Sequence, residues 1–450
     1  MIARHAGTVL AGQFAVMAFG VTDTIVAGRY AQDALAALSV GSAIFISVFV
    51  ALIGGLQALL PVWAELHGAR REAEVGRSVR QALYLCGGAI ALGMAVLLMP
   101  GALLRWTAVP DAMRGDVEAY LTVLAFALPP ALLFRLFSTL NQGLGKPKLV
   151  TWVQMGALAL KVPLSIWFAF GGAGVPALGL VGCGWATLVV NWGMFALAVW
   201  LLRTQDFYRA YGLWARIEPP DWQQLRRFAR LGIPGALSVL VEVTSFTLMA
   251  LFIARLGATA SAAHQIASNL TAVAYMVPLS LSIATSARVS YWLGAGDATQ
   301  ARRACARGFE LTLGGALVIA SLMVAARGWL ADVYTDDLAV TALATTLLLA
   351  TACYHMADAT QTLCVFVLRC YRVTIAPLVL YCALLWGVGL GGSYLLAYRG
   401  LGPWPAMQSP LAFWLMSAAA LWLTALLFAA LLWRTLRRAR LPEPAPPAPA

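Results

Sequence analysis

Twelve long apolar runs, separated by short polar segments, make up most of the chain. They lie at residues 8–29, 39–63, 79–101, 116–141, 149–170, 179–202, 231–254, 262–292, 304–326, 338–366, 374–398 and 408–433. An α-helix needs about 20 apolar residues to cross the hydrocarbon core of a bilayer, and each run provides them. The pattern therefore predicts an all-α integral membrane protein with twelve transmembrane helices.

The composition leaves almost nothing for a soluble domain. Apolar residues make up 61% of the 450 residues and charged residues only 11%, whereas soluble domains carry about 25% charged residues. The first run continues from Thr8 past Val26 without a small-residue cleavage pattern, so we expect it to remain as the first span. The seven cysteines form no C-x-x-C pair, which argues against a zinc site or a disulfide framework. Because the apolar spans take up nearly the whole length, the composition excludes a catalytic module outside the membrane.

The basic residues gather on one side of the predicted membrane. The chain has 31 Lys and Arg against 19 Asp and Glu, a formal net charge of +12. With the amino terminus inside the cell, 22 basic residues fall in inner segments, six in outer segments and three within spans. Because Lys and Arg favour cytoplasmic loops, both termini are predicted to be cytoplasmic, in a bacterial inner membrane. The charge sets the orientation, and no nucleic-acid partner is expected.

The chain divides into two similar halves of six spans each. We predict an amino-terminal lobe (1–202), a cytoplasmic linker (203–230), a carboxy-terminal lobe (231–433) and a disordered tail (434–450), whose Pro-rich end has no apolar face to bury. A constant shift of 226 residues places Ala36-Ala37 on Ala262-Ala263. An even number of spans gives both repeats the same orientation, an arrangement found in secondary transporters.

Charged residues deep within spans are candidate functional groups, because a charge is costly in hydrocarbon. Four are found here: Asp23, Lys161, Glu242 and Asp358. Polar residues at helical spacing accompany the two acids of the second half and form a further seam on the eighth span. These are Ser238 and Ser245 beside Glu242, Thr351, Tyr354 and Gln361 beside Asp358, and His264, Ser268, Thr271 and Tyr275. The alternative is that these polar groups only form hydrogen bonds between helices. This interpretation explains the hydroxyl groups better than it explains the carboxylates.

Two neighbouring carboxylates in an apolar site cannot both stay ionised without a bound cation. Glu242 and Asp358 are therefore predicted to take up a proton or Na+, and Asp23 offers a similar site in the first half. The stretch from Gly143 to Pro147 lacks the spacing of a phosphate-binding loop. No cofactor is expected, and an ion gradient would supply the energy.

Short motifs along the chain resemble those of one known family. They are the segments at 22–29, 242–244, 262–267, 294–297 and 354–359. In order and spacing, from about Leu10 to Leu432, they resemble the multidrug and toxic compound extrusion (MATE) transporters, specifically the NorM-like branch. The resemblance implies a twelve-helix, two-lobe antiporter in the lipid bilayer that exports cationic or amphipathic drugs in exchange for Na+ or H+. We expect it to act as a monomer.

The resemblance also assigns site residues. It implies functional acids at Asp23, Glu242 and Asp358, with Tyr354 beside the cation site. The chain departs from the family pattern in the fifth span, where Lys161 and Ser165 stand in place of asparagines. Two interpretations of Lys161 remain open: its ammonium reaches a polar pocket or interface, or it forms a salt bridge with Asp23.

Two other functions compete with drug export. A flippase for a lipid-linked precursor would be expected to carry a cluster of basic residues in its cavity, but Lys161 is the only deep one. A prenyl-transferase-type membrane enzyme would need paired Asp motifs at the cytoplasmic face to hold Mg2+ and pyrophosphate. The one such pair, Asp332 with Asp336, lies on the predicted outer side.

Overall fold

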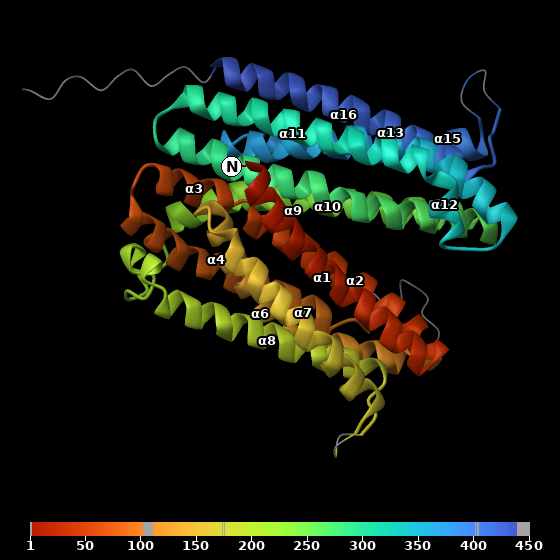
Figure 1. Ribbon diagram of the computed structural model, residues 1–450, viewed down its shortest axis with the longest axis horizontal. Coiled ribbons are helices and arrows are strands. Elements are labelled where there is room, and N and C mark those ends of the chain that lie inside the picture. Colours follow the sequence, from red (N-terminus) through yellow and green to blue (C-terminus); the bar gives the residue numbers. More distant parts are fainter. Residues whose placement is uncertain are drawn as a thin grey trace, which may run out of the picture. The chain divides into compact units, whose positions relative to one another are not determined.

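The computed structural model describes residues 2–101, 111–172, 174, 176–400, 402 and 405–438, and these residues fold into helices (Figure 1). Twelve helical segments of the described residues are long and apolar enough to cross a membrane, which confirms the predicted number of spans. The helices are α1 (Ile2–Tyr30), α2 (Gln32–Gln57), α3 (Leu60–Gly68), α4 (Glu72–Leu98), α6 (Asp111–Gly143), α7 (Pro147–Phe170), α8 (Leu180–Thr204), η1 (Asp206–Tyr211), α9 (Trp222–Ala254), α10 (Ala258–Gly294), α11 (Ala298–Ala325), α12 (Arg327–Asp332), α13 (Leu338–Cys370), α14 (Ile375–Tyr381), η2 (Cys382–Gly391), α15 (Gly392–Tyr398) and α16 (Pro410–Arg438).

The helices form two compact units. One consists of Thr8–Ala236, and the other of Leu237–Ala450 with Met1–Gly7. In the first unit α6 is central and packs against α2, α4 and α8. Its leucines at 121, 124, 128 and 132 are fully buried or nearly so, and their spacing of three or four residues places them on one helical face.

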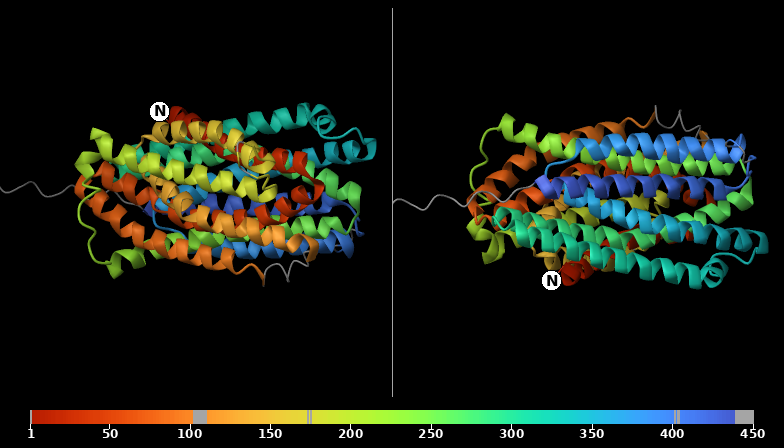
Figure 2. Two further views of the ribbon diagram at one scale, coloured as in Figure 1. Left: turned by 90° about the horizontal axis from the view of Figure 1, so that it is seen from below. Right: turned by 90° about the horizontal axis from the view of Figure 1, so that it is seen from above.

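In the second unit the central helix is α13, which packs against α10, α11 and α16 (Figure 2). Its last eight residues, from Leu363 to Cys370, are all buried. A helix that is buried all round its circumference lies in the core of its unit. Side chains on every face of this carboxyl-terminal part of α13 are therefore held by neighbouring helices, whereas Leu349 and Cys353 nearer its amino end are exposed.

The eleventh span contains a feature that the apolar run does not predict. Between α14 and α15 the backbone forms the π-helix η2, ten residues long. Four glycines stand in or beside it, at 387, 389, 391 and 392, and the Ser393 hydroxyl donates to the carbonyl of Gly389. A π-helix is rare and occurs often at functional sites, and η2 contributes residues to the pocket described below.

The polypeptide between α8 and α9 is held against α4. Nε of Arg80 donates to the Glu218 carboxylate at 2.8 Å, and the same guanidinium also pairs with the second carboxylate oxygen. Its third nitrogen donates to the carbonyl of Gly212 at 2.6 Å. Gly76 on α4 makes this approach possible, because a Cβ there would lie 1.8 Å from the Tyr211 carbonyl oxygen.

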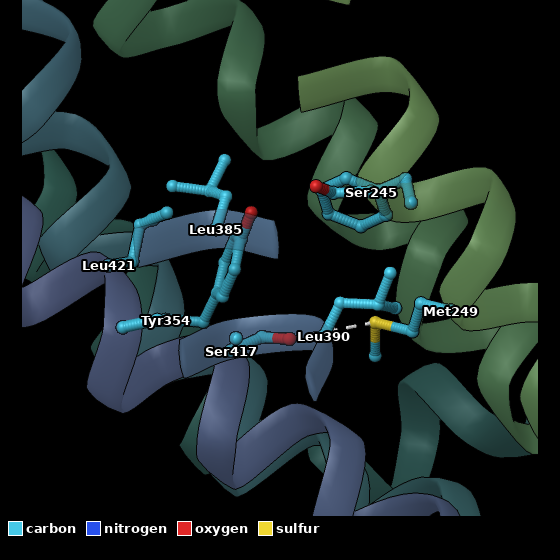
Figure 3. Close-up of a pocket in the computed structure, with 10 residues that line it drawn as sticks. Ser245, Met249, Tyr354, Leu385, Leu390, Ser417 and Leu421 are labelled. Atoms are coloured by element: carbon cyan, nitrogen blue, oxygen red, sulfur yellow. Dashed lines mark hydrogen bonds between the residues drawn. The ribbon is translucent and has the colours of Figure 1, made fainter. Parts of the chain in front are cut away.

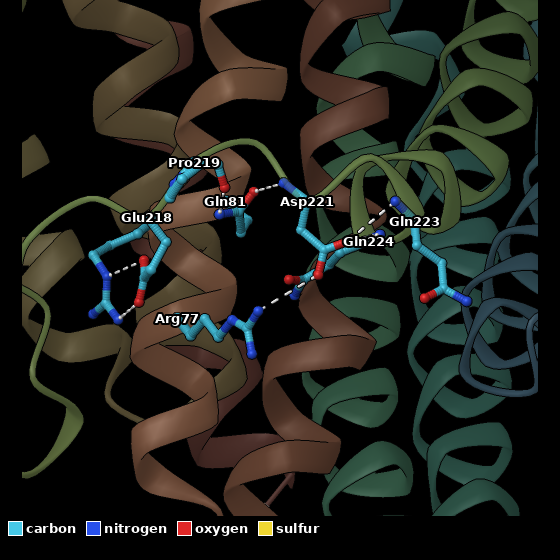
Figure 4. A network of polar contacts seen from close by, with 8 residues as sticks. Arg77, Gln81, Glu218, Pro219, Asp221, Gln223 and Gln224 are labelled. Carbon is cyan, nitrogen blue, oxygen red and sulfur yellow. Dashed lines mark hydrogen bonds and ion pairs between the residues drawn. The ribbon is translucent and has the colours of Figure 1, made fainter.

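Gln81, which follows Arg80 on α4, fixes the start of α9 (Figure 4). The Gln81 amide donates to the carbonyl of Pro219 and accepts from the backbone N–H of Asp221, both at 2.9 Å. The Asp221 carboxylate in turn accepts from the first N–H groups of α9, those of Gln223 and Gln224. Such a cap stabilises a helix by about 1 kcal/mol, and Arg77 adds an ion pair to the same carboxylate at 3.6 Å.

The Arg80–Glu218 pair predicts that docking of this segment depends on pH. Hydrogen bonding from Arg80 lowers the pKa of Glu218 to about 2 from its ordinary 4.5. The pairing therefore stabilises the docked segment fully above about pH 4.5, and this contribution is lost as the pH falls toward 2. Pepsin should cleave the segment faster at pH 2 than at pH 4 in the wild type, whereas Glu218→Gln should already be cleaved several-fold faster at pH 4.

Asp206→Asn is the matched control, because Asp206 lies in the same segment in an exposed ion pair with Arg209. It should behave as the wild type at both pH values. Equal cleavage of the wild type and Glu218→Gln at pH 4 would show that the Arg80–Glu218 pair does not hold the segment.

Two helix ends differ from the expected ones. The predicted disordered tail from residue 434 is wrong at its start, because α16 continues to Arg438. Arg437 stacks on Trp433 at 3.5 Å, and basic side chains favour the carboxyl terminus of a helix. The Pro-rich end of the tail lies outside the described residues. The tenth apolar run predicts a helix that ends at residue 366, but α13 continues to Cys370. Arg369, which the apolar pattern assigns to an inner loop, is therefore buried within this helix.

Candidate functional site

Helices α9, α10 and α13 bring two acids and a phenol together in the second unit. Asp358 on α13 is 2% exposed, and Glu242 on α9 is half-buried. The two carboxylates are close enough for their charges to interact, and both charges also interact electrostatically with the hydroxyl group of Tyr275 on α10. Within the described residues, neither acid forms an ion pair with a Lys or Arg. Binding of a proton or a small cation would neutralise such a pair.

A hydrogen-bond chain runs from Asp358 to the eleventh span. The Gln361 amide donates to the Asp358 carboxylate at 2.8 Å, and the Tyr381 hydroxyl donates to the amide oxygen of Gln361. Tyr381 was not among the predicted site residues. Its sequence neighbourhood is uniformly apolar, so no helical periodicity marked it, and only the packing of α14 against α16 beside α13 reveals its position.

Tyr354 lies one helical turn from Asp358 in an aromatic cluster. Its ring meets Phe246 and Trp414 edge to face, at centroid distances of 5.9 and 5.6 Å. His264 packs against Trp414 at 5.8 Å and hydrogen-bonds Ser268 at 3.3 Å. These contacts fix the Tyr354 ring, because edge-to-face pairs favour one geometry.

A small pocket opens beside this cluster (Figure 3). It has a volume of about 30 Å3, room for about two water molecules. Its lining comprises Ser245, Phe246 and Met249 of α9, Tyr354 of α13, the η2 residues Leu385, Gly389 and Leu390, and Ser417, Ala420 and Leu421 of α16. The Ser245 hydroxyl is buried and forms no hydrogen bond to another described residue. A buried hydroxyl of this kind is costly unless water or a ligand satisfies it.

Two of the remaining predicted polar residues hydrogen-bond within their own helices. Thr271 donates to the carbonyl of Ala267, and Thr351 to that of Leu347, each four residues earlier. Such bonds satisfy the hydroxyl locally. Ser238 is 4% exposed on the Glu242 helix. The two threonines therefore neither bridge helices nor reach the acids.

In the first unit, Lys161 of α7 forms a salt bridge with Asp23 of α1 at 2.7 Å. The lysine is fully buried and the aspartate is 8% exposed. The Lys161 ammonium also donates to the Thr187 hydroxyl at 2.7 Å and to the carbonyl of Cys183 at 3.1 Å. The sequence left two interpretations of Lys161 open, and the structure agrees with the one in which it forms a salt bridge with Asp23.

This environment satisfies both charges. An ammonium group has three N–H donors, and three acceptors surround that of Lys161. The Asp23 carboxylate also accepts from Ser165 at 3.3 Å. The lysine thus occupies the position beside Asp23 that an exchangeable cation would need, so the carboxylate of the first unit is already neutralised.

Comparison with known proteins identifies the family. A model of the MatE family matches residues 9–167 and 234–395. The chain belongs to the MatE family. It is 38% identical over 437 residues to a probable multidrug resistance protein NorM of Aromatoleum aromaticum, covering 97% of this chain and 94% of the relative. It is 34% identical to the multidrug resistance protein PmpM of Pseudomonas aeruginosa over 407 residues, covering 89% and 83%.

Solved structures show the same fold. The Vibrio cholerae MATE transporter VcmN in its bent form matches with a TM-score of 0.85 and 18% identity, covering 97% of this chain and 96% of that one. The eukaryotic MATE transporter AtDTX14 matches with a TM-score of 0.86 and 18% identity, covering 98% and 97%. The MATE-like fold and the family resemblance are thereby confirmed. As a member of a transporter family the multi-pass membrane protein is not an enzyme, and the prenyl-transferase alternative is excluded.

Proposed function

We propose that this MatE protein is a secondary active exporter of cationic or amphipathic drugs, driven by exchange with Na+ or H+. Its relatives NorM and PmpM are named multidrug resistance proteins, which supports drug export. The arrangement of Glu242 and Asp358 supports ion exchange, because neither acid forms an ion pair with a Lys or Arg among the described residues. This arrangement is the observation on which the proposal rests.

The two units would contribute differently to coupling. Lys161 already neutralises Asp23, so the first unit has no free carboxylate at this position. Glu242 and Asp358 would take up the coupling ion, with Tyr354 and the Asp358–Gln361–Tyr381 chain positioning it. The two six-helix lobes would alternate in exposing the drug site to the two sides of the membrane.

The protein would act as a monomer in the bacterial inner membrane, with both termini cytoplasmic. The excess of Lys and Arg in segments on the side of the termini supports this orientation. Reporters fused within residues 203–230 and at the carboxyl terminus test it, and an external signal from either would contradict it.

Dye efflux from proteoliposomes tests the function. The purified protein is reconstituted with a fluorescent cationic dye, and a Na+ gradient and a pH gradient are applied separately. Efflux under at least one gradient is expected, and its dependence on the gradient identifies the ion. Efflux that is equal with and without both gradients would contradict secondary transport.

A further inference from the structure

The first unit holds an arginine within its core that no acid balances. Arg135 of α6 is half-buried, and every other residue of this helix from Phe134 to Gly143 is buried. Within the described part of the chain, Arg135 forms no ion pair. A guanidinium keeps its proton in a protein, and such a charge among buried groups is costly without an opposite one. Arg135 therefore needs a negative charge that the described side chains do not supply.

One glutamine contacts this guanidinium. Nη2 of Arg135 donates to the side-chain amide oxygen of Gln57 at 3.2 Å, and the bond joins two helices that pack together, α6 and α2. Gln57 is the last residue of α2 and is 7% exposed. The orientation of its amide follows from the chemistry of the pair. A guanidinium has no acceptor, so the amide presents its oxygen to Arg135 and directs its NH2 group elsewhere.

Two donors at this contact have no acceptor. Nε of Arg135 and the side-chain nitrogen of Gln57 are both buried, and neither donates to a described residue. In each group a single carbon separates this nitrogen from the atom that makes the 3.2 Å bond, so both donors border the same contact. Buried donors without an acceptor are costly. The contact thus combines a positive charge with unused donors, and this combination favours an anion.

We propose that Arg135 and Gln57 form a binding site for a small anionic group, a carboxylate or chloride. The bound anion accepts from Nε of Arg135 and from the Gln57 amide, and it neutralises the guanidinium. Arginine suits this role because its planar group carries several donors and keeps its charge. A free anion and the carboxylate of a zwitterionic drug share this chemistry. In the second form the inference rests on the proposed function, with the first unit binding the acidic group of the drug.

Thermal unfolding of the purified protein in a maltoside detergent tests anion binding. The probes are sodium chloride and sodium acetate, titrated separately. With at least one of them, the wild-type unfolding temperature should rise with concentration and then saturate, because a ligand of the folded state stabilises it. Arg135→Gln removes the charge, so the saturable rise should disappear. Without either probe this variant should be at least as stable as the wild type, because no uncompensated charge remains.

Arg288→Gln is the matched control. Arg288 is a half-buried arginine on α10 that stacks on Tyr291 and Trp292 at 5.2 and 5.0 Å. Its guanidinium is not part of the proposed site, so this variant should keep the saturable rise of the wild type. The control separates binding at Arg135 from a general effect of salt on a basic protein.

Gln57→Glu tests the site by filling it. A carboxylate at this position pairs with Arg135 across the existing contact and takes the place of the ligand. The variant should therefore unfold at a higher temperature than the wild type without either probe, and it should show no saturable rise. The site is overturned if the wild type shows no saturable rise with either probe, or if the rise persists in Arg135→Gln or in Gln57→Glu.

Two dyes identify the source of the anion. One is a rhodamine with a free carboxylate, and the other is its ethyl ester, which is purely cationic. If the site receives the drug, Arg135→Gln should raise the KM for efflux of the carboxylate dye about tenfold and leave that of the ester unchanged. An unchanged KM for both dyes assigns the site to a free anion. If neither dye leaves wild-type proteoliposomes under either gradient, the proposed function has failed, and the unfolding experiment still decides the site.

Discussion

Glu242→Gln and Asp358→Asn should each leave the protein folded in the membrane but reduce ion-driven efflux by at least a hundredfold. An amide of the same shape keeps the packing, yet it can neither release a proton nor neutralise a cation. Because the charges of the two acids interact, either change alone should abolish ion uptake by the pair. Dye efflux from proteoliposomes under the gradient that drives the wild type measures the loss.

Asp332→Asn provides the control for this experiment. Asp332 ends the short helix α12 and is exposed, so its amide should leave efflux unchanged. Thermal unfolding in detergent verifies that the two site variants remain folded. Wild-type rates in both folded variants would show that the ion is bound elsewhere.

The spans and the charged candidates could be predicted because their signals are local. An apolar run of membrane length is read directly from the chain, and a carboxylate such as Asp358 within one stands out against its neighbours. The periodicity of Ser245, Tyr354 and Gln361 also marked helix faces that line the pocket or hydrogen-bond an acid. Thr271 and Thr351 shared that periodicity, although their hydroxyls bond within their own helices. Spacing alone does not distinguish these two outcomes.

Features that depend on packing between distant segments could not be predicted. Tyr381 reaches Gln361 only through the arrangement of α14, and Arg369 is buried only because α13 continues beyond its apolar run. The bond between Arg80 and Glu218 joins residues 138 positions apart. The π-helix η2 has no apolar pattern of its own, since its span is uniformly apolar and rich in glycine. In each case the decisive contact is tertiary.

The Lys161–Asp23 pair should show strong non-additivity. Lys161→Met and Asp23→Asn each leave one buried charge without its partner, which costs about 3–5 kcal/mol of stability. The double variant removes both charges and should lose far less than the sum of the two single losses, giving a coupling energy of about 3 kcal/mol or more. Thermal unfolding of the four proteins in the same detergent measures the cycle.

The exposed pair of Arg209 and Asp206, at 3.1 Å, is the control cycle because both side chains are largely in water. Its coupling should be well below 1 kcal/mol, since screening and side-chain entropy cancel most of the attraction. Additive losses at Lys161 and Asp23 would show that the two charges do not depend on each other. If the double variant also retains ion-driven efflux, the lysine is a fixed substitute for a cation in the first unit. Coupling would then be carried by Glu242 and Asp358, because a charge that never leaves its carboxylate cannot carry energy from a gradient.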